Sequence, residues 1–228
     1  MKRQPRHFYC NVIVIVLIII AICSCNSLPT RKHKPQSLYG MIYDRDNRPV
    51  NNVILYVNNK PMAVSDIQGR FIIPKLNPQS QYTIAARKDA YEEVVIEISF
   101  IDPSDVLYIR LYSADQLLAE AEDALKGKDW DRTESLLIRA QNAGGNDIAI
   151  QFLHGVLLYY KKEYRQALAI LSELSEIERN APYLFLFMAD LCQYYLEDPA
   201  EASRHLDKFL SMQFDPAIQR RRDELASL

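Results

Sequence analysis

The chain has 228 residues, of which 49% are apolar and 25% are charged. A chain of this length and composition can bury the cores of one or two ordinary domains. Its formal net charge of -2 excludes the strongly basic balance that nucleic-acid-binding proteins usually show, so no nucleic-acid partner is expected.

The N-terminal residues differ from the rest of the chain. Lys2, Arg3 and Arg6 give a basic start, and residues 12–22 (VIVIVLIIIAI) form an uninterrupted apolar run. The run has the length of the central part of a secretory signal and falls short of the about 20 apolar residues of a spanning helix. Residues 1–24 are therefore predicted to be a signal peptide.

The end of this run, Ile22-Cys23-Ser24-Cys25, resembles the lipobox of bacterial lipoproteins: an aliphatic residue, two small residues and an obligatory cysteine. The resemblance implies that the peptide is cut before Cys25 and that acyl chains such as palmitate are attached there. Each buried methylene contributes about 0.8 kcal/mol, so two or three chains hold a soluble domain on a bilayer. Cys23 departs mildly from the pattern. An uncleaved signal anchor and secretory cleavage without lipid are the alternatives.

Residues 25–37 are polar, contain two prolines and are predicted to be a tether. The RKHK cluster within them suits either anionic lipid headgroups or, more simply, a solvated linker. Once the signal peptide is removed, Cys192 has no partner but the lipid-bearing cysteine. Its thiol is therefore expected to be buried as a small hydrophobic group, in a fold held together without disulfides.

Residues 38–112 alternate between short runs rich in Val, Ile, Tyr and Phe and clusters of turn-forming residues. This pattern predicts about seven short strands in a small antiparallel β-sandwich. Within one run, Val94, Ile96 and Ile98 are expected on one face because side chains alternate along a strand. Three prolines are expected at strand ends, where no hydrogen bond of the sheet is lost: Pro49, Pro61 and Pro74.

Specific positions in this stretch follow a pattern: Gly40-x-Ile42-x-Asp44, Arg48-Pro49-Val50, Ser65-Asp66-x-x-Gly69-x-Phe71-x-Ile73 and Tyr82-x-Ile84. The pattern resembles the carboxypeptidase regulatory-like domain, a transthyretin-like β-sandwich, and implies a non-catalytic module. Asp66 is expected to cap a turn in which Gly69 takes a positive φ. Asn52 and Ala90 stand where glycines are common. A calcium site at Asp44, Asp46 and Asp66 is an alternative, although no EF-hand spacing is present.

After Tyr112 the pattern changes to Leu, Ala, Glu and Lys at helical spacing, from an N-cap at Ser113. Comparison of the chain with itself shows a period of 34 residues, which aligns Trp130 with Tyr164. Small residues recur at the equivalent positions Ala121, Gly155 and Ala189. A second small position, at Ala167 and Ala202, requires one extra residue near 197–199.

A 34-residue helix–turn–helix with these small residues resembles the tetratricopeptide repeat. The resemblance implies a three-repeat α-solenoid over residues 113–228, with Trp130 and Tyr164 filling the turns between helices and Thr133 breaking the small-residue pattern. Residues 217–227 read as a charged capping helix after Asp215-Pro216. The arginines at 220–222 are expected on its solvated face, with an anion-binding patch as the alternative.

In that family the first helices of the repeats line a groove. Carried over to this chain, the predicted partner-binding residues are Phe152, Val156, Tyr159, Tyr160, Tyr183, Leu186, Asp190, Gln193 and Tyr194, with Leu118, Glu122 and Lys126 from the first repeat. Such an aromatic, lightly charged set suits the anchoring of a peptide or protein. The alternative is that Phe152 and Tyr159 pack between repeats or against the β-domain.

No catalytic or cofactor motif accompanies these features. His154 and His205 lack metal-ligand spacing, and neither a G-x-S-x-G, a Walker loop nor a C-x-x-C occurs. We therefore expect no enzymatic activity, cofactor or metal.

The combined prediction is a lipoprotein held by Cys25 on the cell membrane or outer membrane, on the periplasmic or extracellular side. It would act as a non-catalytic adaptor for an unknown envelope protein or peptide. The alternatives are carbohydrate or peptidoglycan binding by the β-domain, through Tyr39, Tyr43 and Tyr56, and a purely structural surface lipoprotein. The two modules are expected to pack together because the link at Tyr112-Ser113-Ala114 is short.

Overall fold

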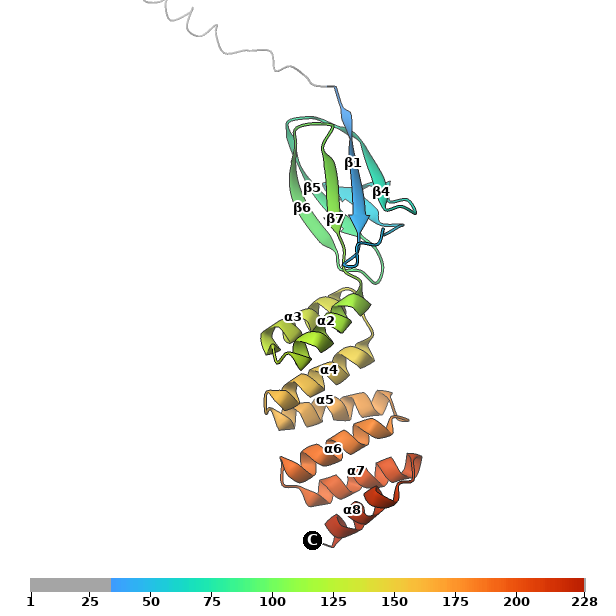
Figure 1. The fold of residues 1–228 in the computed structure, drawn as a ribbon, viewed down its shortest axis with the longest axis vertical. Coiled ribbons are helices and arrows are strands. Elements are labelled where there is room, and N and C mark those ends of the chain that lie inside the picture. Colours follow the sequence, from blue (N-terminus) through green and yellow to red (C-terminus); the bar gives the residue numbers. More distant parts are fainter. Residues whose placement is uncertain (1–33, 228) are drawn as a thin grey trace, which may run out of the picture. The chain divides into compact units, whose positions relative to one another are not determined.

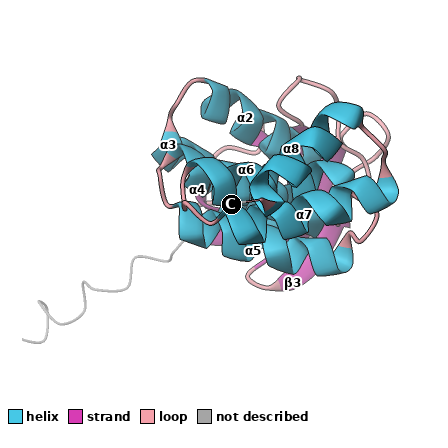
Figure 2. Cartoon of the chain, turned by 90° about the horizontal axis from the view of Figure 1, so that it is seen from below, coloured by secondary structure: helices cyan, strands magenta, loops and turns pink. Residues whose placement is uncertain are grey.

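The computed structural model describes residues 34–227. The predicted signal peptide, Cys25 and most of the predicted tether lie outside the described residues. Within the described part, seven strands are followed by seven helices along the chain. Figure 1 shows the strands and the helices in separate parts of this region, and in the view from below in Figure 2 the cyan helices lie in front of the magenta strands. The predicted class, a small β-sandwich followed by a helical repeat stack, is confirmed.

The strands form two sheets. The three-stranded sheet has the order β4-β1-β7, built from β1 (Gln36–Tyr43), β4 (Arg70–Leu76) and β7 (Val106–Arg110). The four-stranded sheet has the order β3-β2-β5-β6, built from β2 (Ile54–Val57), β3 (Lys60–Val64), β5 (Ser80–Arg87) and β6 (Val94–Phe100).

The sandwich is not wholly antiparallel as predicted. β1 and β7 pair in parallel, with Tyr39 opposite Val106 and Tyr43 opposite Arg110. The reason is topological: β6 lies in the other sheet, so the chain crosses between sheets before β7 and enters it in the direction of β1.

Two of the three prolines lie inside strands rather than at their ends, contrary to the prediction. Pro61 belongs to β3 and Pro74 to β4, and both strands lie at the edge of their sheet. Edge strands tolerate proline because one side of the strand has no hydrogen-bonding partner. The pairing register shifts beside each proline. The run around Pro61 was not recognisable as a strand in the sequence, because a proline normally argues against that assignment.

The core of the sandwich consists of alternating strand residues. Ile42, Leu55, Ile73 and Ile84 have no exposed surface, and Val94, Ile96 and Ile98 pack against this cluster as predicted. Alternation places the remaining side chains of these strands on the outer faces.

The predicted turn at Asp66 is confirmed. Its carboxylate accepts the N–H groups of Gln68 and Arg70, each at 2.9 Å, and Gly69 has a φ of 73°. The two departures from the family pattern also adopt left-handed backbone, with φ of 54° at Asn52 and 61° at Ala90. Both turns therefore keep the conformation that glycine would favour, at a steric cost for Ala90.

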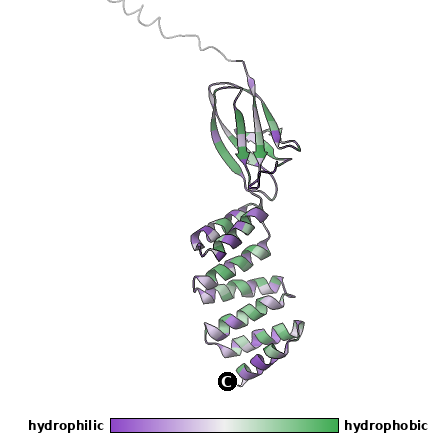
Figure 3. Ribbon diagram, viewed as in Figure 1, coloured by the Kyte–Doolittle hydropathy of each residue, from purple (hydrophilic) through white to green (hydrophobic). Residues whose placement is uncertain are grey.

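The helices form three antiparallel hairpins and a final single helix. Their bounds are α2 (Ala114–Lys126), α3 (Trp130–Asn142), α4 (Asp147–Tyr160), α5 (Tyr164–Ile177), α6 (Pro182–Tyr194), α7 (Pro199–Met212) and α8 (Pro216–Ala226). The predicted caps are confirmed: Ser113 forms a capping box with Gln116, and Asp215 caps α8 ahead of Pro216. Beside the C-terminus in Figure 3, α8 carries strongly hydrophilic purple segments, as its charged sequence predicts.

The repeat period is visible in the packing. Ala121, Gly155 and Ala189 are all buried, and Leu171 touches the position where a Cβ on Gly155 would lie, at 3.0 Å. Close approach of the two helices in a hairpin therefore requires small residues here.

The second small position is also buried, at Ala167 and Ala202. Thr133 replaces it in the first repeat with its hydroxyl satisfied, because Oγ1 donates to the carbonyl of Asp129 at 2.8 Å.

The extra residue lies in the third hairpin turn, as predicted. Each hairpin turn contains one residue with left-handed backbone: Lys128, Lys162 and Glu197. The first two are 34 residues apart and the last two are 35 apart. The insertion is thus accommodated in the turn and leaves the helices in register.

The sandwich and the helices share a tight junction, as the short link predicted. Leu111 belongs to the sandwich core and Tyr112 packs on the core of the first hairpin. The N–H of Ala114 donates to the carbonyl of Ala90, and that of Glu92 to the carbonyl of Tyr112, both at 2.9 Å. Neighbouring residues, Leu111 and Tyr112, therefore pack in the core of the sandwich and against the core of the first hairpin.

Cys192 is buried as predicted, with no exposed surface, and burial raises the pKa of its thiol to about 11.

No helix within residues 34–227 combines the length and apolar character needed to cross a membrane.

Candidate functional site

The predicted partner-binding residues lie on the first helices of the second and third hairpins, α4 and α6. Three tyrosines among them are the most exposed: Tyr160 at 49%, Tyr183 at 50% and Tyr194 at 61%. Tyr183 and Tyr194 are three helical turns apart on α6, and Tyr160 occupies on α4 the position equivalent to Tyr194, so the three share one side of the stack. We call this side the tyrosine face.

Two other predicted residues pack between repeats, which was the alternative for them. The ring of Phe152 meets that of Tyr183 edge-on, with centroids 5.5 Å apart. Tyr159 lies among Tyr164, Phe187 and Tyr195, and its hydroxyl is 2.8 Å from that of Tyr195. This hydrogen bond, together with burial, raises the pKa of Tyr159 to about 12. Both side chains therefore build the support of the tyrosine face.

The aromatic residues that open the second helices have a different role from the predicted one. Trp130 stacks on Tyr160 of the next hairpin, with centroids 5.5 Å apart, and Tyr164 stacks on Tyr195 of the hairpin after it, at 4.4 Å. They connect successive repeats instead of only filling their own turn, and they hold one side of the exposed Tyr160 in place.

At the C-terminal end of this face, α8 contacts three of the predicted partner-binding residues. Arg221 pairs with Asp190 at 2.8 Å, donates to Gln193 Oε1 at 2.6 Å and lies over the ring of Tyr194, 5.1 Å from its centroid. Arg222 pairs with Asp207 and Asp223. The prediction that these arginines lie on a solvated face is thus wrong for Arg221 and Arg222, since both guanidinium groups form ion pairs within the protein.

The tyrosine face carries few charges. α4 has one acidic residue, at its N-terminus, and no lysine or arginine, while α6 has only Asp190, which Arg221 pairs. On the first hairpin Leu118 is buried, and Glu122 and Lys126 lie 4.0 Å apart as a pair. Val156 and Leu186 are half-buried supports. The face therefore offers aromatic and apolar contact with little electrostatic attraction.

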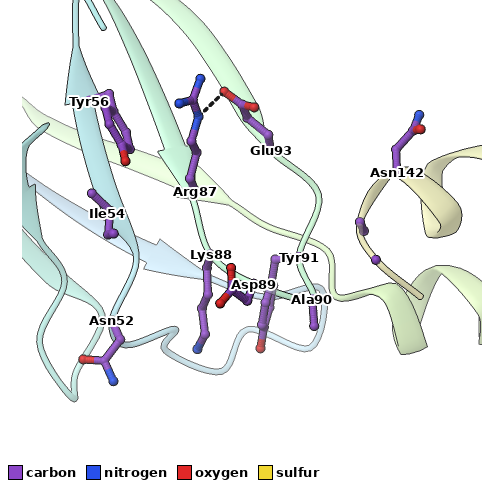
Figure 4. Close-up of a pocket in the computed structure, with 12 residues that line it drawn as sticks. Asn52, Ile54, Tyr56, Arg87, Lys88, Asp89, Ala90, Tyr91, Glu93 and Asn142 are labelled. Atoms are coloured by element: carbon purple, nitrogen blue, oxygen red, sulfur yellow. Dashed lines mark hydrogen bonds and ion pairs between the residues drawn. The ribbon is translucent and has the colours of Figure 1, made fainter. Parts of the chain in front are cut away.

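A second candidate site was not foreseen in the sequence. A crevice of about 970 Å³ lies between the outer face of the four-stranded sheet and the α3–α4 connection. Figure 4 shows Ile54 and Tyr56 on one strand, Arg87 and Glu93 beside them, and Asn142 on the opposite wall. Its residues come from three separate segments, part strand and part turn, so no local motif marks it.

The three tyrosines suggested for carbohydrate binding do not form one site. Tyr39 lies on the three-stranded sheet, half exposed, and the hydroxyl of Tyr43 on the same strand contacts the sulfur of Met41. Tyr56 lies on the other sheet and lines the crevice.

The suggested calcium ligands are not a cluster either. Asp44 accepts the N–H groups of Asp46 and Arg48, whereas Asp66 caps its own turn and pairs with Arg70. No group of three or more acidic, histidine or cysteine side chains within residues 34–227 is arranged to hold a metal ion.

Comparison with known proteins finds similarity only among solved structures. No protein-family model matches the sequence, and no curated protein matches it. PcrH from Pseudomonas aeruginosa is 17% identical, over 50% of this chain and 86% of PcrH, with a TM-score of 0.40. PcrH in complex with the chaperone binding region of PopB matches with the same identity and TM-score over 50% of this chain and 92% of that one. The CopN–Scc3 complex is 16% identical over 50% and 67%, with a TM-score of 0.41.

Proposed function

We propose that this protein is a non-catalytic adaptor that binds a protein or peptide through the tyrosine face. The observation that carries the proposal is the exposure of Tyr160, Tyr183 and Tyr194 on a side of the stack that carries few charges and where Asp190 is already paired with Arg221. Tyrosine supplies a large contact area at low entropic cost and is enriched at interaction hot spots. A partner segment with apolar or aromatic anchors fits such a face.

The rigidity of the support favours binding as well. Stacking of Trp130 on Tyr160, and of Arg221 on Tyr194, restricts two of the three rings before any partner arrives. A preordered side chain loses less freedom on association, which leaves more of the contact energy as affinity.

The experiment is a crosslinking pulldown from native membranes with the intact chain and two variants. One variant is Tyr160→Ala/Tyr183→Ala/Tyr194→Ala. The other, Tyr39→Ala/Tyr108→Ala, removes equally exposed tyrosines from the β-sandwich and serves as the matched control. We expect a partner that the intact chain and the control capture and the triple variant loses, with thermal unfolding of both variants verifying the fold. A partner retained by the triple variant contradicts the proposal.

We further propose that the protein is held on the cell membrane or outer membrane, facing the periplasm or the outside, by acyl chains on Cys25. The support is the lipobox-like sequence at 22–25. In cells fed an alkyne-tagged fatty acid, the intact chain should become labelled and sediment with membranes. Cys25→Ser should remove the label, and Cys10→Ser should keep it. Labelling of the Cys25→Ser variant would contradict attachment at this residue.

A further inference from the structure

The crevice has the dimensions of a ligand site. Its volume of about 970 Å³ lies at the upper end of the range found for small-molecule sites. Ile54, Tyr56 and Ala143 supply apolar lining, and polar side chains surround them (Figure 4). Such a mixture binds molecules that have both apolar surface and several hydrogen-bonding groups.

The charged groups of the crevice are balanced in number, and three of the four have hydrogen-bond or ion-pair partners. Arg87 donates to Glu93 at 2.7 Å and lies over the ring of Tyr56, 4.6 Å from its centroid. Lys88 donates to the backbone carbonyl of Asn51 at 3.0 Å and lies over the ring of Tyr91. Two cations therefore face two carboxylates, Asp89 and Glu93, and the crevice has no net charge to attract an ion.

Three amide and carboxylate side chains of the crevice remain without a partner. Those of Asn52, Asp89 and Asn142 make no hydrogen bond or ion pair to other described residues, and they come from the loop before β2, the β5–β6 turn and the end of α3. Each is a planar group with two adjacent hydrogen-bonding atoms. Such groups match neighbouring hydroxyls on a ring, because each amide can donate to one hydroxyl and accept from the next, and the carboxylate can accept from two neighbouring hydroxyls.

The floor of the crevice disfavours an extended peptide. β2 and β5 lie inside the four-stranded sheet, and their backbone groups are paired on both sides. A peptide could not add to the sheet here as a further strand, so its own N–H and C=O groups would depend on a few scattered side chains. A sugar does not need that regular ladder of partners.

We propose that the crevice is a binding site for a neutral oligosaccharide. Asn52, Asp89 and Asn142 bond its hydroxyls from three sides, and its ring faces lie against Ile54 and the edge of Tyr56. The site is independent of the tyrosine face, so either can be lost without the other.

The experiment is a titration of the full chain with four neutral tetrasaccharides, built respectively of N-acetylglucosamine, β-linked glucose, α-linked glucose and mannose, followed by saturation-transfer NMR. We expect at least one to bind. Asp89→Ala/Asn142→Ala should weaken it by about tenfold or more, since each lost hydrogen bond contributes about 1 kcal/mol. Asn180→Ala, an exposed asparagine in the α5–α6 connection, is the matched control and should bind as the intact chain does.

The proposal is overturned if none of the four sugars binds, or if the double variant binds as tightly as the intact chain. A third overturning result comes from a pool of uncharged peptides: if these bind, lose binding in the double variant and displace no sugar, the crevice is a peptide site. Because Asp89 and Asn142 belong to neither core, thermal unfolding of the double variant should match that of the intact chain.

Discussion

Arg139 of α3 and Glu92 of the sandwich form a two-pronged ion pair across the junction. Nε and one terminal nitrogen of the guanidinium donate to the two carboxylate oxygens at 2.8 and 2.7 Å, and the group also lies 5.3 Å from the ring centroid of Tyr112. Hydrogen bonding to Glu92 raises the pKa of Arg139, which therefore stays charged. The pair joins two segments far apart in the sequence, and both partners are about two-thirds or more buried.

A double-mutant cycle with Arg139→Gln and Glu92→Gln should show a coupling free energy of about 1–2 kcal/mol, below the value for a buried charged hydrogen bond because both groups retain some solvent. Urea unfolding gives the four free energies. The cycle on Lys161 and Glu134, a single contact of 3.0 Å within the helices, should give about 0.5 kcal/mol or less. Equal coupling in the two cycles would show that the bidentate geometry adds nothing.

Replacing Ala90 with glycine should stabilise the protein by about 1 kcal/mol. Ala90 has a φ of 61°, where its Cβ is crowded, and glycine relieves this at a smaller cost in unfolded-state entropy. Ala143→Gly, at a φ of -79°, is the control and should destabilise by about 0.5–1 kcal/mol. Thermal and urea unfolding measure both. A loss of stability in Ala90→Gly would contradict the assigned backbone conformation.

The hydroxyl of Tyr159 should lose its proton only near pH 12. NMR titration of chain labelled at the tyrosine ζ-carbon would follow it. Tyr195→Phe removes the main cause of the raised pKa and should lower it, whereas Tyr160→Phe should change it little. Because the pKa of Tyr159 is higher in the folded than in the unfolded state, this hydroxyl contributes to the free energy of unfolding. The contribution is complete below the unfolded pKa of about 10 and is lost as the pH rises from about 10 to about 12.

His205 should make the protein less stable below neutral pH. Burial lowers the pKa of its imidazole, against the opposing effect of Glu201, 3.4 Å away. The neutral form is therefore favoured in the folded state. The contribution of His205 to the free energy of unfolding is complete above its unfolded pKa of about 6.5, and it is lost as the pH drops toward its pKa in the folded state. Free energies of unfolding at pH 7.5 and 5.5 should differ less in His205→Gln than in the intact chain. An unchanged difference would contradict this assignment.

Patterns with a period were predictable from the sequence. Burial of one side imposes a period of two on strands and 3.6 on helices, so the faces of β6, the 34-residue repeat and the extra residue beside Glu197 could all be inferred. The residues of the tyrosine face were carried over from the resemblance to the tetratricopeptide repeat, and the period adds only that Tyr160 and Tyr194 are one repeat apart.

Pairings between distant segments were not predictable. Nothing near β7 in the sequence indicates that its neighbour is β1, and Arg221 reads as a solvated residue until α8 brings it to Asp190. Pro61 masks a strand because only its edge position makes the proline acceptable. The crevice depends on three segments meeting, and none of them alone carries a sequence motif for a binding site.

The parallel pairing of β1 and β7 has a mechanical consequence. Residues before Gln36 enter one end of this pair, and the helices leave from its other end, after Arg110. A pulling force between the N-terminal segment and the helices would therefore load the hydrogen bonds from Tyr39 to Tyr43 together, in shear, instead of opening them one after another. Resistance to such a force is set by the rate of unfolding rather than by equilibrium stability. A chain held by its N-terminal segment and pulled at its helices would bear that load across the β1–β7 pair.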